Sequence, residues 1–121
     1  ISACLVGSEM CIRDRANIVI DPGIGFGKNK MHNLDILRNL SMFHGLGVPI
    51  LIGLSRKSLI EELSIDNFKS RGINKKSINP SKRLSGSIAF AIHAINNGVQ
   101  IIRTHDVFET NQAFICQRAL I

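Results

Sequence analysis

V-P-I-L-I-G-L-S-R-K-S, residues 48–58, is the stretch that decides the fold class. Its apolar run is too short for a confident helix and stops abruptly at polar residues, which is typical of a buried strand that ends in a loop. Two similar runs flank it along the chain. They are I-V-I at residues 18–20, followed by Asp21, and Q-I-I at residues 100–102, followed by Arg103. The sequence therefore predicts three buried strands, each ending in polar residues.

Helical patterns separate and follow these strands. Glycines 45 and 47 end the first pattern, as glycines at helix ends do. Asp106 and Glu109, three residues apart, predict a capping box that opens the last helix. Because no hairpin turn joins the strands, the order strand–helix repeated three times predicts a parallel α/β arrangement. The apolar positions that mark the helices are Leu34, Leu37, Leu40 and Phe43, then a brief stretch at residues 59–63, then Leu84, Ile88, Ala91, Ile92 and Ile95, and finally Phe108, Ala113 and Ile115.

Length and composition describe a globular domain or a piece of one. A chain of 121 residues is too short to close an eight-stranded βα barrel, which needs roughly 200 residues or more. Hydrophobic residues make up 45% of the chain and charged residues 20%, a balance that excludes a disordered chain. With no Trp and no Tyr, the chain lacks the aromatic platforms of a protein that binds single-stranded nucleic acid.

The cysteines and the hydropathy pattern indicate the cellular compartment. Cys4, Cys11 and Cys116 are odd in number and lack metal-ligand spacing, so they predict neither a disulfide framework nor a zinc site and favour a reducing cytoplasm. No apolar run approaches the roughly 18 residues of a membrane span. Charged residues between positions 9 and 15 exclude a secretory signal peptide.

The net charge of +6 comes from one segment, residues 69–83, which holds six cations and no acidic residue. The pattern is typical of a solvated connection, and a surface for nucleic acid or membrane is the alternative. The six cations are Lys69, Arg71, Lys75, Lys76, Lys82 and Arg83.

Polar residues follow the carboxyl end of each predicted strand, where βα loops build binding sites. Lys57, Arg103 and His105 together predict an anion pocket, although His105 alone is more often structural. Asp21 is either a turn-forming residue or a carboxylate that accepts two parallel N–H bonds from a ligand. The glycine loop at residues 23–27 predicts a flexible turn more strongly than a phosphate cradle.

Four motifs in this order resemble the carboxyl-terminal part of the dihydropteroate synthase family, from about residue 17 to the end of the chain. They are D-P-G-I-G-F-G-K, G-L-S-R-K-S, R-L-S-G-S and R-T-H-D-V-F-E-T. The resemblance implies the carboxyl-terminal three βα units of a (β/α)8 TIM barrel of the pterin-binding type, incomplete in this chain. We therefore predict a partial barrel domain at residues 16–121. Residues 1–15 do not match the family and are predicted to be a non-native leader.

The resemblance also implies a cytoplasmic transferase of folate biosynthesis, a homodimer when full length. The family joins 4-aminobenzoate to 6-hydroxymethyl-7,8-dihydropterin diphosphate, and gives 7,8-dihydropteroate and diphosphate. Mg²⁺ is expected, with its protein ligand outside this chain. We expect the isolated chain to be inactive, because the other βα units carry the rest of the site.

Roles carried over from the family fall on matching residues of this sequence. Asp21 would bind the amino-pyrimidine edge of the pterin, and Lys57 would contact the pterin and the aminobenzoate site. Arg103 and His105 would face the diphosphate, so that Lys57, Arg103 and His105 form the predicted catalytic set. The remaining predicted substrate-binding residues are Phe26, Ser55 and Ser58, which would line the aminobenzoate pocket where sulfonamides compete, together with Gly53 and Thr104.

Two other functions compete with this interpretation. A pterin-binding methyltransferase of the same barrel superfamily shares the Asp-Pro-Gly strand end, but methyl transfer releases no diphosphate that would need Lys57 and Arg103. A basic nucleic-acid-binding module would use residues 69–83, and salt-dependent binding to DNA would identify it.

Overall fold

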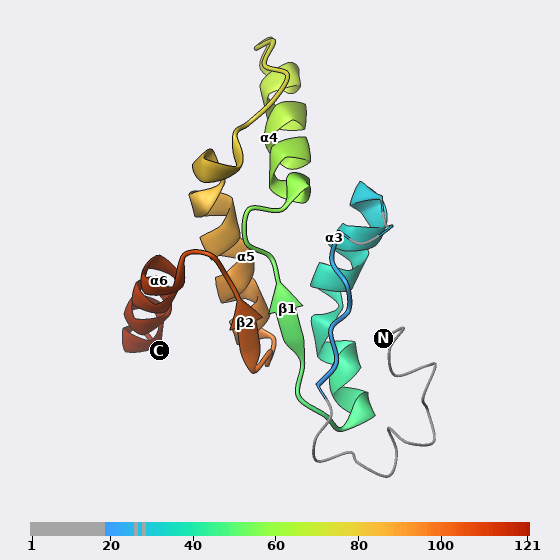
Figure 1. The fold of residues 1–121 in the computed structure, drawn as a ribbon, viewed down its shortest axis with the longest axis vertical. Coiled ribbons are helices and arrows are strands. Elements are labelled where there is room, and N and C mark those ends of the chain that lie inside the picture. Colours follow the sequence, from blue (N-terminus) through green and yellow to red (C-terminus); the bar gives the residue numbers. More distant parts are fainter. Residues whose placement is uncertain (1–18, 26, 28) are drawn as a thin grey trace.

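The computed structural model of the chain describes residues 19–25, 27 and 29–121. The predicted leader at residues 1–15 and the predicted site residue Phe26 lie outside these described residues. Helices flank a short parallel sheet, and α4 rises away from it (Figure 1). The elements are α3 (Lys30–Arg38), the 3-10 helix η2 (Leu40–Leu46), β1 (Leu51–Gly53), α4 (Ser58–Ser70), the 3-10 helix η3 (Pro80–Lys82), α5 (Leu84–Asn96), β2 (Ile101–Arg103) and α6 (Val107–Ala119).

The sheet confirms the parallel arrangement predicted from the sequence. β1 pairs with β2 in parallel, with Gly53 opposite Arg103. Ile20 adds an isolated parallel bridge to Ile50, so the first predicted strand takes its place beside β1. β1 is shorter than the predicted run at residues 48–54, since its ladder begins only after Pro49, which has no N–H to donate. The N–H of Ile50 bonds to the Gln100 side chain instead of to a neighbouring strand.

The helices follow the predicted order, with two differences. The first predicted helix is divided at Asn39 into α3 and the 3-10 helix η2, and α4 is longer than predicted. α4 runs to Ser70, whereas the apolar pattern predicted a brief helix at residues 59–63. The added turns are mostly polar but also hold Ile65 and Phe68. They carry Asp66, which forms an ion pair with Lys30 and so joins this part of α4 to α3.

The predicted capping box at the start of α6 is wrong. Asp106 is the N-cap residue, but its side chain makes no capping hydrogen bond. Its carboxylate instead accepts from the guanidinium of Arg56, and its own N–H donates to Thr104 Oγ1. A charged partner holds the carboxylate more strongly than a neutral backbone N–H does.

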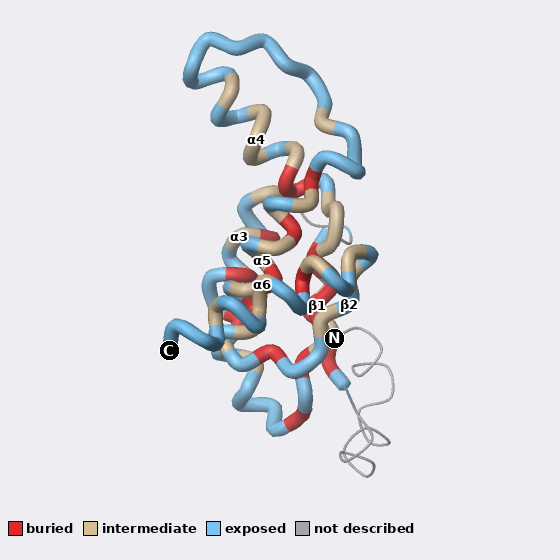
Figure 2. Tube along the Cα trace, turned by 90° about the vertical axis from the view of Figure 1, so that its left-hand side faces the viewer, coloured by how far each residue is buried: buried red, intermediate tan, exposed pale blue. Residues whose placement is uncertain are grey.

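The core lies between the strands and the helices that cover them. Buried residues gather there, whereas the segment after α4 is exposed along most of its length (Figure 2). No helix in the described part of the chain is long and apolar enough to cross a membrane. The core cluster consists of Ile24, Leu37, Leu40, Ile50, Ile52, Leu54, Leu59, Ala94 and Val99.

The basic connection is only partly the solvated segment that the sequence predicted. Lys69 belongs to α4, and Arg83 is buried with 9% of its surface exposed. The Arg83 guanidinium donates to Glu61 and to the carbonyl of Ile78, which compensates its loss of water. Residues 71–77 between them are exposed, as predicted.

Candidate active site at the carboxyl ends of the strands

A pocket of about 200 Å³ opens at the carboxyl ends of β1 and β2. Both strands are parallel, so the loops that follow them meet at one edge of the sheet. The pocket is lined by Gly53, Ser55, Lys57, Arg103, Thr104 and His105, all of them predicted site residues. The structure therefore brings together residues that lie about fifty positions apart in the chain.

The guanidinium of Arg103 lies close to the backbone of Gly53. A Cβ atom added at Gly53 would stand 2.6 Å from Arg103 Nη2 and 3.0 Å from Nε, so no other side chain fits there while Arg103 keeps its place. Arg103 Nη2 also lies 3.8 Å from Asp21 Oδ2. Gly53 thus leaves room for the guanidinium, and Asp21 attracts it by charge.

Asp21 combines the two roles that the sequence left open. Its Oδ1 accepts from the N–H of Gly23 at 2.8 Å, which makes it a turn residue. Its Oδ2 faces Arg103, so the same carboxylate borders the cationic pocket. Asp21 is half-buried, and its predicted contact with a pterin stays a prediction.

Lys57 lies between the glycine loop and Arg103. A Cβ at Gly25 would be 3.5 Å from Lys57 Cδ, so the lysine stem lies over the backbone of Gly25. Gly25 has a φ of +86°, which suits the turn reading of this loop. Burial lowers the pKa of Lys57, and the neighbouring Arg103 lowers it further, while Asp21 opposes the shift. The ammonium is therefore partly desolvated, and an anionic ligand beside it would stabilise its charged form.

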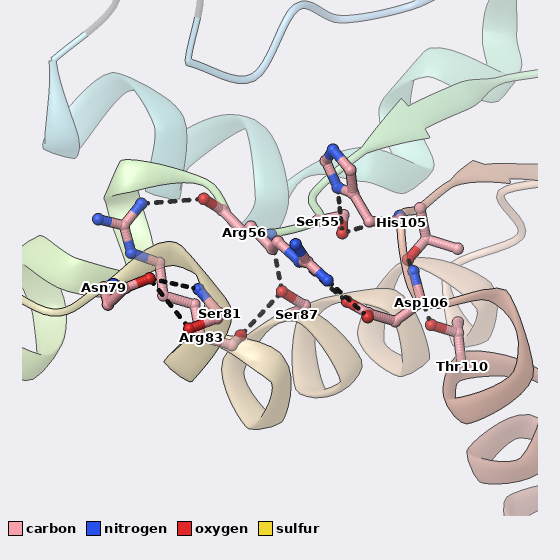
Figure 3. Close-up of polar contacts among 10 residues, drawn as sticks. Ser55, Arg56, Asn79, Ser81, Arg83, Ser87, His105, Asp106 and Thr110 are labelled. Atoms are coloured by element: carbon pink, nitrogen blue, oxygen red, sulfur yellow. Dashed lines mark hydrogen bonds and ion pairs between the residues drawn. The ribbon is translucent and has the colours of Figure 1, made fainter.

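Ser55 fixes the orientation of His105. The N–H of His105 donates to Ser55 Oγ at 3.1 Å, and Oγ also lies 2.9 Å from His105 Nδ1 (Figure 3). With Nδ1 engaged, Nε2 is the ring nitrogen that can meet a ligand. Ser55 therefore acts here as a support for His105, a contact that sequence spacing alone does not reveal.

Ser58 and Arg56 are the sequence neighbours of Lys57, but neither lines the pocket. Ser58, a predicted substrate-binding residue, is exposed at the start of α4 and does not line the pocket. Arg56, next to Lys57 in sequence, forms an ion pair with Asp106 at 2.9 Å. The sequence carries no local signal for that pair, because its members are fifty residues apart.

Among the described residues, no group of three or more His, Cys, Asp or Glu side chains is placed to hold a metal ion. Asp21 is the carboxylate beside the pocket, and its two oxygens face Gly23 and Arg103. Mg²⁺ dependence therefore stays a prediction, and the cations of this chain are the charges available to an anion.

The sequence matches the family of pterin binding enzymes over residues 8–105, a range that begins inside the predicted leader at residues 1–15. The chain belongs to this family. Among pterin binding enzymes, the dihydropteroate synthase of Escherichia coli K12 is 43% identical over 99 residues, which cover 82% of this chain and 31% of that protein. The dihydropteroate synthase of Neisseria meningitidis serogroup B is 39% identical over 106 residues, covering 85% and 33%. The chain thus spans about a third of the length of these relatives.

Solved structures of pterin binding enzymes resemble this fold. The crystal structure of dihydropteroate synthase from Yersinia pestis has a TM-score of 0.74 and 36% identity, and covers 93% of this chain and 42% of that one. The enzyme from Xanthomonas albilineans, in complex with 7,8-dihydropteroate, has a TM-score of 0.75 and 35% identity, covering 95% and 40%. These matches confirm the resemblance to dihydropteroate synthase and the predicted fold, a part of a (β/α)8 barrel.

Proposed function

We propose that this chain forms the leaving-group side of a dihydropteroate synthase active site. The proposal rests on one observation: Lys57, Arg103 and His105 line a single pocket at the carboxyl ends of the strands, with Asp21 paired to Arg103 at its border. The related enzyme from Xanthomonas albilineans holds 7,8-dihydropteroate. The proposed substrates are 6-hydroxymethyl-7,8-dihydropterin diphosphate and 4-aminobenzoate.

The charges of the pocket suit the electron flow of this condensation. The amine of 4-aminobenzoate forms a bond to the pterin methylene, the C–O bond to diphosphate breaks, and the amine loses a proton. Negative charge grows on the diphosphate as the bond breaks, so cations preplaced there stabilise the transition state more than the ground state. Arg103 suits paired phosphate oxygens because its guanidinium is a planar fork.

Asp21 suits the other end of the reacting bond. Positive charge develops on the pterin methylene and spreads into the ring as diphosphate leaves, and a carboxylate at the ring edge stabilises it. The same carboxylate accepts two N–H bonds from an amino-pyrimidine edge in the fork geometry that favours such contacts. We infer that the Asp21–Arg103 pair marks the border between the pterin and diphosphate subsites.

The test requires a complete barrel. We define the hybrid barrel as residues 16–121 joined in register to the amino-terminal portion of the E. coli relative, of which this chain covers 31%. It should form 7,8-dihydropteroate and diphosphate, and Arg103→Ala should lower kcat/KM by about 10²-fold or more, as loss of a preorganised donor does. Product is measured by chromatography. A folded hybrid barrel that binds neither substrate would refute the proposal.

The isolated chain should show no dihydropteroate formation above background. Its sheet of two strands leaves the edge of β2 open among the described residues, and open edges favour association with other chains. Activity and light scattering of the purified 121-residue chain check this expectation. A monodisperse, active preparation would contradict it.

Compartment and assembly extend the same proposal. An exposed free thiol at Cys116 suits a reducing cytoplasm. A homodimer is proposed for the full-length enzyme, and sedimentation of the hybrid barrel tests it. DNA binding that survives the loss of both Lys57 and Arg103 would favour the basic-module alternative instead.

A further inference from the structure

Arg56 has a backbone conformation that its own side chain does not favour. Its φ is +56°, in the left-handed region, and it is the one non-glycine residue with positive φ in the part of the chain that the structure describes. Such a conformation persists only where surrounding contacts hold it in place. The next residue is Lys57, so whatever holds Arg56 also sets where Lys57 enters the pocket.

Contacts from three residues of two other segments hold Arg56 (Figure 3). Its N–H donates to Ser87 Oγ at 2.8 Å, and its carbonyl accepts from Arg83 Nη1 at 3.0 Å. Its guanidinium makes two bonds to Asp106, 2.9 Å from Nη2 to Oδ1 and 3.3 Å from Nε to Oδ2. The backbone and the side chain of Arg56 are therefore both fixed, by α5 on one side and by the β2–α6 loop on the other.

Arg83 is anchored in its turn. It is buried, and its guanidinium bonds to Glu61 of α4 at 2.9 Å as well as to the Arg56 carbonyl. The N–H of Ile78 also donates to Glu61, and this bond lowers the pKa of Glu61, helped by Arg83. A planar guanidinium can satisfy these separate acceptors at once, whereas a lysine ammonium could not reach them with the same geometry.

Two adjacent bridges join the pocket loops. Ser55 meets His105, and the next residue, Arg56, meets Asp106, the residue after His105. Each bridge spans fifty residues of sequence. Two neighbouring contacts between the same two loops fix their relative orientation, which one contact alone would leave free to pivot. His105 is part of the first bridge, Lys57 directly follows Arg56 of the second, and both residues line the pocket.

We propose that Arg56 is a positioning residue that locks the β1–α4 loop to the β2–α6 loop through Asp106. Its role is to hold Lys57 and His105 at their separation in the pocket, without contact of its own with substrate. The inference rests on the proposed function for its kinetic consequence only. The loop lock itself can be measured without any activity.

The kinetic test compares variants of the hybrid barrel. Arg56→Gln and Asp106→Asn should each lower kcat/KM by tenfold or more, because displaced catalytic groups lose alignment with the reacting atoms. The double variant should be no worse than the poorer single one, since both changes break the same bridge. The exchanged pair Arg56→Asp with Asp106→Arg should recover part of the loss, and aspartate tolerates a left-handed backbone.

Lys30→Gln is the matched control. It also removes the cation of an ion pair between two elements, Lys30 with Asp66, but that pair does not line the pocket. It should leave kcat/KM within about twofold at a temperature well below the melting point. The proposal fails, and Arg56 is merely structural, in either of two cases. One is that Arg56→Gln and the control lose activity alike, and the other is that the losses from Arg56→Gln and Asp106→Asn add in the double variant.

Hydrogen exchange separates this inference from the proposed function. The N–H of His105 donates to Ser55 Oγ across the two loops, so its exchange rate reports whether they stay together. Arg56→Gln should speed exchange at His105 by about tenfold, and Arg56→Lys, which keeps the charge but not the fork, should give an intermediate rate. Unchanged protection in both variants would overturn the loop lock. If the unsubstituted hybrid barrel is inactive while the two Arg56 variants still show these exchange rates, only the proposed function is refuted.

Discussion

A single methyl group at Gly53 should displace the cation that we place at the leaving group. The Cβ of Gly53→Ala would stand 2.6 Å from Arg103 Nη2, 3.0 Å from Nε and 3.1 Å from Cζ. Ordinary contact between such atoms begins at roughly 3.5 Å, so the guanidinium must move by about 1 Å. It is the flexible end of a long side chain, and more than half of that side chain is exposed. We therefore expect movement of Arg103 and not a change of the strand.

The size of the effect follows from that displacement. A shift of about 1 Å in a group that contacts the reacting atoms can cost about 10²-fold in rate. Because the Arg103 side chain is largely exposed, it can rearrange and restore part of its contact with the leaving group. We expect kcat/KM of the hybrid barrel to fall by about 10- to 100-fold, or roughly 1.4 to 2.8 kcal/mol of transition-state stabilisation. The assay is steady-state formation of dihydropteroate, with the melting temperature measured alongside.

Gly45→Ala is the control for Gly53→Ala. Nothing lies within 4 Å of a Cβ built at Gly45, which is exposed in η2. The same substitution there should leave both kcat/KM and the melting temperature close to the original values. The reasoning fails if Gly53→Ala keeps kcat/KM within about twofold, because Arg103 would then be either unimportant or indifferent to its position.

Four further predictions test single charges of the hybrid barrel. Asp21→Asn should weaken pterin binding by about 2 to 4 kcal/mol in calorimetry, since it exchanges an acceptor for a donor. Arg103→Ala should weaken binding of the pterin diphosphate far more than binding of the diphosphate-free pterin. Equal losses of affinity for the two ligands would make Arg103 structural. Lys57 should react with an amine reagent at lower pH in the folded hybrid barrel than in the unfolded chain, because burial and Arg103 lower its pKa in the folded state. Identical pH profiles would contradict this. The hydrogen bond from the Arg56 guanidinium lowers the pKa of Asp106. The stabilisation that this carboxylate gives the fold is therefore present above the unfolded carboxyl pKa of about 4 and is lost as pH falls through the folded pKa. Asp106→Asn should flatten the acid side of a plot of unfolding free energy against pH, and an unchanged acid side would refute this prediction.

Local patterns determine the order of the elements and the edge where the site lies. Apolar runs such as Ile50–Ile52 are short, and this shortness with the polar residues after them already separates strand from helix. The carboxyl ends of parallel strands meet at one edge of the sheet. The sequence alone therefore predicts that Asp21, Lys57 and Arg103 are neighbours. Their chemistry with a pterin diphosphate comes from the resemblance and stays to be measured.

The tertiary structure alone decides which polar groups pair across the fold. Arg56 and Lys57 are neighbours in sequence, yet one forms an ion pair with Asp106 and the other lines the pocket. Arg83 looked like part of a solvated basic segment, but it is buried against Glu61, twenty-two residues away. A charge carries no local mark of its distant partner, because pairing depends on which loops the packed core brings together. Apolar periodicity acts within a few residues, so the sequence alone determines the elements, while the packed structure selects the partners of their charges.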